Sequence, residues 1–184
     1  MIDHKSAAQS QKSMQWEELK QLYDQDFVLW IERTTEQIRR GEMKNLDWEH
    51  LLTEIEDLGR EQRNQVESYL IQTVKHLLMY QYWLTEKGNC GRGWADKIDN
   101  FRLELEILFQ SKTLYNYGAS RLDIIYDKAK RSVIKKTGLS VDTFPQVCPY
   151  TFAEIIDFDF LPVQNTRIKG KKENYRYNEV VAYS

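Results

Sequence analysis

The sequence predicts an all-α protein, an irregular bundle of about five helices around one long central helix, with an extended C-terminal tail. Two observations lead to this prediction. Apolar residues recur at intervals of three, four, seven or eight along most of the chain, instead of alternating as in half-buried strands. Residues that start or end helices, such as glycine after paired cations, stand between these periodic segments.

Length and composition are those of one globular domain, predicted over residues 1–162 and followed by a tail over 163–184. The net charge of −2 argues against nucleic-acid binding by the whole domain. The spacing of Cys90 and Cys148 is not that of a metal site, and we interpret both as reduced thiols. No apolar run suggests a signal peptide or a membrane span, so a cytoplasmic protein is expected.

The first helical pattern covers residues 14–40, and Asp24 or Asp26 can cap its second part. Arg39 and Arg40 followed by Gly41 form a suitable end. The cations lie beside the negative helix terminus, and glycine can adopt the left-handed conformation there.

The central segment runs from Asp47 to about Thr85, and the remaining helices are expected to pack against its apolar side. Asp47 is placed to cap the first turn. Gly59 is the weak point, because glycine costs about 1 kcal/mol relative to alanine inside a helix. The sequence leaves open whether the helix continues or bends there.

The glycine-rich segment from Gly88 to Gly93 is expected to form a loop, and a plain turn is favoured over an anion site because no strand precedes it. Two further helical patterns follow, over residues 94–109 and 114–137, and Gly138 ends the second.

The last ordered segment begins with an extended stretch, Phe144–Tyr150, because each proline disfavours helix in the residue before it. Thr151 and Glu154 then form the pattern of a capping box, which predicts a short helix that ends before Pro162. The predicted core of the whole bundle comprises Phe27, Trp30, Leu51, Ile55, Leu58, Leu70, Leu77, Trp83, Ile98, Phe101 and Leu105.

Candidate chemistry lies in acidic residues at the edge of the central helix. Glu54, Asp57 and Glu61 share one side of a helix, and Asp96 with Asp99 opens the next helix. Such carboxylates could hold a divalent metal ion or transfer protons. Ion pairs with neighbouring basic residues are the simpler interpretation, and no cofactor is predicted outside the metal alternative.

His76 lies on the same side of the central helix. Fifteen residues separate it from Glu61, which is roughly 22 Å along a straight helix, so one ion cannot bind both. We therefore expect His76 to be a half-buried structural residue that is hydrogen-bonded to a carboxylate or carbonyl of a packed helix.

The tail changes composition after Val163 and becomes basic and rich in tyrosine. The simpler interpretation is a solvated extension. The alternative is a segment that orders on a partner. The candidate partner-binding residues are Arg167, Lys169, Lys171, Lys172, Tyr175, Arg176 and Tyr177.

Several segments in their joint order resemble the bacterial family known as "domain of unknown function 29", which is abundant in cyanobacteria. The matching segments span Tyr23–Pro162: Tyr23–Gly41, Leu46–Arg60, Lys75–Trp83, the spacing of Trp94, Ile98 and Arg102, and Phe144–Pro162. One departure is Thr53, where the family tends to have glutamate before Glu54. The resemblance implies an all-helical, cytoplasmic bacterial protein, and it implies no reaction and no catalytic residues.

Three functions remain open from the sequence. The first is a non-catalytic interaction or regulatory module with a protein partner, because no catalytic signature is present. The second is a metal-dependent hydrolase of the helical-bundle type that uses the carboxylates. The third is weak nucleic-acid binding through the basic tail. The sequence does not indicate the oligomeric state.

Overall fold

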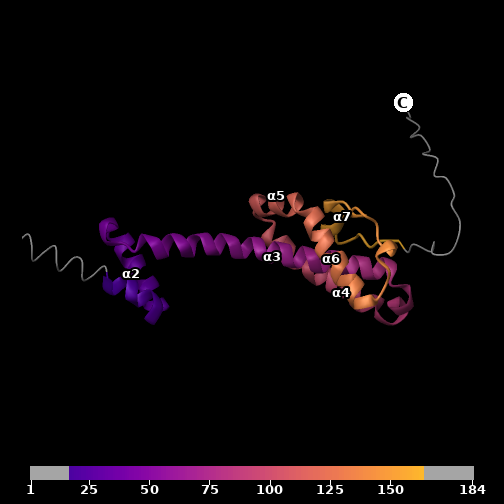
Figure 1. Cartoon of the computed structure of the whole chain (residues 1–184). Coiled ribbons are helices and arrows are strands. Elements are labelled where there is room, and N and C mark those ends of the chain that lie inside the picture. Colours follow the sequence, from indigo (N-terminus) through magenta and orange to yellow (C-terminus); the bar gives the residue numbers. More distant parts are fainter. Residues whose placement is uncertain (1–16, 164–184) are drawn as a thin grey trace, which may run out of the picture. The chain divides into compact units, whose positions relative to one another are not determined.

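The computed structural model describes residues 17–163, which form seven α-helices and no strand (Figure 1). The predicted all-α fold with a long central helix is confirmed. There are more helices than the sequence suggested because two predicted segments are each divided, one at Asp26 and one at Arg121. The chain divides into two compact units, unit 1 (residues 1–64) and unit 2 (residues 65–184).

Unit 1 contains a helix over residues 17–25, α2 (Phe27–Arg39), the short 3-10 helix η1 (Met43–Asn45) and the start of α3 (Trp48–Tyr82). Asp26 caps α2, because its Oδ1 accepts a hydrogen bond from the Leu29 amide at 3.0 Å. Gly41 has a φ of +72°, so it ends this segment in the left-handed conformation that the sequence predicts.

The helix α3 is the longest element, with 35 residues, and it continues through Gly59 without a break. Asp47 caps it as predicted, with Oδ1 3.4 Å from the His50 amide nitrogen. Residues up to Asn64 belong to unit 1, and residues from Gln65 belong to unit 2.

Unit 2 continues with α4 (Leu84–Leu108), α5 (Lys112–Ser120), α6 (Leu122–Thr137), η2 (Val141–Thr143) and α7 (Phe152–Ile156). Gly138 ends α6 with a φ of +70°. Thr151 and Glu154 form the predicted capping box at the start of α7. The segment between η2 and α7 is neither helix nor strand.

The segment from Gly88 to Gly93 is helical, so the prediction of a loop there is wrong. Tertiary packing overrides the low helix propensity of glycine at this point. The Trp94 ring stacks on Trp83, the residue before α4, with centroids 5.5 Å apart. Gly91 is buried, and a Cβ atom there would lie 3.1 Å from Cγ of Lys87.

The main hydrophobic core belongs to unit 2, and its buried residues lie between Val66 and Ile155. The predicted core residues Leu70, Leu77, Ile98 and Leu105 are fully buried there, and Trp83 and Phe101 are partly buried. In unit 1, Trp30 is buried as predicted and Leu51 is partly buried.

Three predicted core residues, Phe27, Ile55 and Leu58, are instead exposed. Helical periodicity identifies an apolar stripe but does not show which element covers it. No helix among the described residues is both long and apolar enough to cross a membrane.

Candidate functional site

The predicted carboxylates on the first half of α3 have protein partners in two of three cases. The Tyr23 hydroxyl donates to Oε1 of Glu54 at 2.5 Å, and this hydrogen bond raises the pKa of Tyr23 to about 12. Asp57 forms an ion pair with Arg60 on the next turn. Glu61 is exposed. Glu54 therefore joins the helix over residues 17–25 to α3, whereas the ion pair of Asp57 lies within α3.

The predicted carboxylates on α4 lie in unit 2, and both Asp96 and Asp99 are exposed. Oδ1 of Asp99 lies 3.5 Å from Nη1 of Arg102. Throughout residues 17–163, no group of three or more histidine, cysteine, aspartate or glutamate side chains gathers closely enough to hold a metal ion. The structure thus pairs Asp57 and Asp99 with arginines, and within residues 17–163 it does not assemble the candidate acids around a common point.

His76 is buried in unit 2, with Nδ1 2.7 Å from the Gln72 carbonyl oxygen. The sequence analysis predicted a partner on a packed neighbouring helix. The carbonyl instead belongs to the previous turn of α3 itself. Because a carbonyl can only accept, Nδ1 carries the proton. Burial lowers the pKa of His76 to about 4. The imidazole is therefore neutral near pH 7.

A buried polar cluster in unit 1 centres on Asp47, whose side chain is fully buried. Its Oδ2 accepts from Trp30 Nε1 at 3.3 Å and lies 2.5 Å from His50 Nδ1. The Tyr23 ring stacks on His50 with centroids 3.9 Å apart. The cluster ties together the helix over residues 17–25, α2 and α3. The sequence predicted the cap at Asp47 but not its burial, because burial depends on the distant Trp30.

Two further polar residues of unit 2 have structural roles that the sequence analysis did not predict. Glu67 accepts from the Tyr117 hydroxyl at 2.7 Å, from Arg121 at 3.0 Å and from Lys128 at 2.8 Å, so it joins α3 to α5 and α6. These bonds, with the lysine contributing most, hold the pKa of Glu67 at about 2. No short sequence pattern links Glu67 to partners fifty or more residues away.

Arg102 is the second of these residues, and it is buried beneath α7. Its guanidinium donates to the carbonyl oxygens of Glu154 at 3.2 Å, Ile155 at 2.9 Å and Phe160 at 2.9 Å. The carbonyls of Glu154 and Ile155 lie in the last turn of α7, where they have no partner within the helix, and that of Phe160 lies beyond the helix. Arg102 therefore holds the chain segment around α7 on α4.

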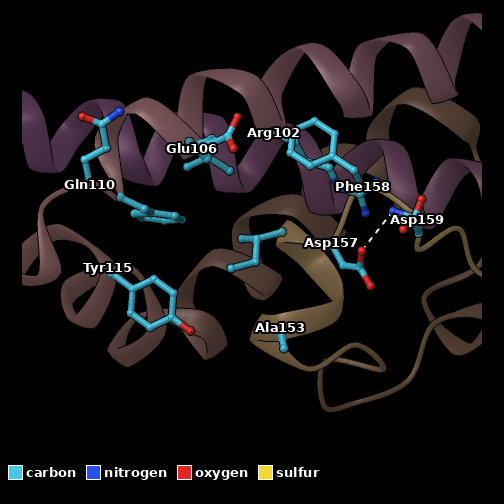
Figure 2. Close-up of a pocket in the computed structure, with 11 residues that line it drawn as sticks. Arg102, Glu106, Gln110, Tyr115, Ala153, Asp157, Phe158 and Asp159 are labelled. Carbon is cyan, nitrogen blue, oxygen red and sulfur yellow. Dashed lines mark hydrogen bonds between the residues drawn. The ribbon is translucent and has the colours of Figure 1, made fainter.

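An open groove of about 840 Å³ lies beside Arg102, between α4, α5 and α7. Figure 2 shows Glu106 and Gln110 on one side of it, with Tyr115 and Ala153 on the other. Asp157 and Asp159 border one end, where the Asp159 amide donates to Asp157 at 2.9 Å. Apolar side chains and three carboxylates suit a cationic ligand. Nε and Nη2 of Arg102 donate to the carbonyls, whereas its buried Nη1 has no hydrogen-bond partner and lies 3.5 Å from Oδ1 of Asp99. The full lining is Arg102, Leu105, Glu106, Phe109, Gln110, Tyr115, Ala153, Ile156, Asp157, Phe158 and Asp159.

A second candidate surface lies on unit 1, along the first half of α3. We call it the α3 stripe, and it consists of Trp48, Leu52, Ile55 and Leu58. Their exposed fractions are 48%, 54%, 57% and 64%. At 100° per residue the four side chains fall within about 120° of one another, so they form one continuous apolar face. The candidate partner-binding residues of the tail, from Arg167 to Tyr177, lie outside the described residues.

The fold and these surfaces define an all-α protein with a well-packed unit and an apolar helix face on a second unit. The family described as "Domain of unknown function DUF29" matches residues 22–161, so the chain belongs to this family. The predicted resemblance is thereby confirmed. Searches of the curated proteins and of the solved structures found no match.

Proposed function

We propose that this chain is a non-catalytic protein-interaction module and that the α3 stripe is its contact surface. The proposal is supported by an imbalance in unit 1. Its described residues, 17–64, bury three apolar side chains, those of Leu19, Trp30 and Leu46. The same residues leave nine large apolar side chains exposed: Phe27, Val28, Ile31, Ile38, Met43, Trp48, Leu52, Ile55 and Leu58.

The imbalance matters because small units depend on the apolar area that they bury. A segment of about 60 residues buries a smaller share of its surface than a larger domain and is only marginally stable by itself. Each Å² of apolar surface removed from water contributes about 25 cal/mol. A partner that covers the α3 stripe would supply the burial that unit 1 lacks, and a continuous apolar patch is typical of such contact surfaces.

The charges around the stripe favour a protein partner over a nucleic acid. Glu49, Glu54, Glu56 and Asp57 give this half of α3 an acidic character, which would repel phosphates. An apolar helix face flanked by charged residues is the surface that helical bundles and helix-binding grooves recognise. We place this interaction in the bacterial cytoplasm, in accordance with the expectation from the sequence.

Site-specific photo-crosslinking in the cells that make the protein tests the proposal. A photoreactive amino acid replaces Ile55 in one variant and Ile107, an exposed residue of α4 in unit 2, in the control. We expect position 55 to yield discrete crosslinked species that position 107 does not yield. If neither position 55 nor position 52 yields a crosslink, the proposed function is wrong.

A further inference from the structure

We infer that the partner of the α3 stripe is the same stripe of a second copy of this chain, in an antiparallel two-fold dimer. The inference rests on the proposed function and identifies the partner. Its support comes from the shape of the stripe and from the order of the charges beside it.

The stripe is suited to pairing with itself. Its four large apolar side chains lie within one arc of α3, as in the seam of a coiled coil. A two-fold axis brings the same patch of both copies together and closes the assembly at two copies. Two pairs of helices that each expose an apolar face also form the common four-helix bundle. Unit 1 supplies such a pair with α2 and the first half of α3, and α2 has an exposed apolar row of its own at Phe27, Ile31 and Ile38.

The charges beside the stripe specify the antiparallel orientation. Glu49, Glu56 and Arg63 are seven residues apart, so they follow one flank of α3. In a parallel two-fold pair, this flank of one copy lies on the opposite side of the seam from the same flank of the other copy, so these charges form no pair. In an antiparallel pair centred at Glu56, Glu49 of each copy lies level with Arg63 of the other. Opposite charges beside the seam stabilise one orientation over the other.

Both members of this predicted pair are placed to reach a second copy. Glu49 is exposed, and its Oε2 lies 2.7 Å from Nζ of Lys20, an ion pair that leaves the other carboxylate oxygen for a further contact. Arg63 is exposed, and its guanidinium lies close to Gly59, on the line of the stripe. The two copies of Glu56 would meet at the centre of the flank, where water solvates them.

Sedimentation equilibrium of the full chain tests the dimer. We expect a mass of twice the chain for the natural sequence at micromolar concentration, and a monomer for Ile55→Glu. The control Ile107→Glu places the same charge on an exposed position of α4 and should remain dimeric. A natural chain that stays monomeric up to high micromolar concentration overturns the inference.

Charge exchange tests the orientation. Glu49→Arg and Arg63→Glu should each weaken the dimer about tenfold, because each change sets like charges beside one another twice in a two-fold assembly. The double variant should recover most of that loss. The double variant and Glu49→Arg both lose the ion pair with Lys20, so this loss cannot explain why the double variant dimerises more tightly. A double variant that is no tighter than either single variant overturns the antiparallel arrangement.

The outcomes separate the inference from the proposed function. If the natural chain is monomeric but position 55 crosslinks to a different protein in cells, the inference is wrong and the proposed function stands. If the chain is monomeric and position 55 yields no crosslink, both are wrong. A position 55 crosslink with the mass of two chains supports both.

Discussion

His76 is the residue whose ionisation is most clearly linked to the stability of the fold. Burial in the core disfavours the imidazolium, and the nearby Lys97, Lys75 and Lys136 add to this effect. The pKa in the folded chain is therefore about 4, compared with about 6.5 in an unfolded chain. Between these values the unfolded chain binds a proton that the folded chain does not bind, so folding weakens as the pH falls.

We predict that the free energy of unfolding decreases by on the order of 2 kcal/mol as the pH is lowered from 6.5 to 4. His76→Gln should flatten the upper part of this dependence, between pH 6.5 and 5, where Glu67 does not titrate. Urea unfolding at a series of pH values measures both proteins. The same slope in this window for His76→Gln and the natural chain would show that His76 is not the group responsible.

Single residues also show the limit of what the sequence can predict. The caps at Asp26, Asp47 and Thr151 were predictable because a cap needs only neighbours within three residues. Arg102 was not assigned a role from the sequence, since its three acceptors lie more than fifty residues further along the chain. The same holds for Glu67 and its partners on α5 and α6.

At the scale of elements, packing decides where glycine is tolerated. Gly59 lies inside α3, and a Cβ atom there would meet only Arg63, at an ordinary contact distance of 3.6 Å. Gly118 lies inside α5, where a Cβ atom would come within 3.1–3.3 Å of Leu70, Val66 and Phe109. The two positions have the same helix propensity but different surroundings.

We therefore predict opposite effects for two matched substitutions. Gly59→Ala should raise the free energy of unfolding by about 0.5–1 kcal/mol, because alanine is the better helix former and meets no obstacle. Gly118→Ala should lower it by about 1–3 kcal/mol through overpacking. Urea unfolding followed by circular dichroism compares both with the natural chain. A destabilised Gly59→Ala variant would contradict the uninterrupted helix at that position.

The helices themselves were largely predictable, since their apolar periodicity and caps are local features of the chain. The exception is the first part of α4, where three glycines suggested a loop. Stacking of Trp83 on Trp94 and the burial of Gly91 favour the helix there. The Trp pair and the contact of Gly91 with Tyr80 each join residues eleven positions apart, so propensity alone could not reveal them.

At the scale of the whole molecule, the two units differ in how their apolar residues are used. Unit 2 has a core that is completed by α4, α5, α6 and α7. Unit 1 has the apolar periodicity of a core at Ile55 and Leu58, yet these side chains are exposed. The sequence analysis assigned Ile55 and Leu58 to the interior and did not identify Trp48 and Leu52, because periodicity does not distinguish a face covered within the chain from one available to a partner.

The most direct test of our central claim, that the α3 stripe is a contact surface, is the accessibility of position 55 in intact cells. In a chain that carries Cys90→Ser and Cys148→Ala, a single cysteine replaces Ile55, or Ile107 as the control. The rate of maleimide labelling is compared between intact cells and dilute purified protein, with position 107 correcting for uptake of the reagent. We predict at least tenfold slower labelling of position 55 relative to position 107 in cells, and similar rates for the two positions in dilute solution. Equal relative rates in cells and in dilute solution would contradict the claim.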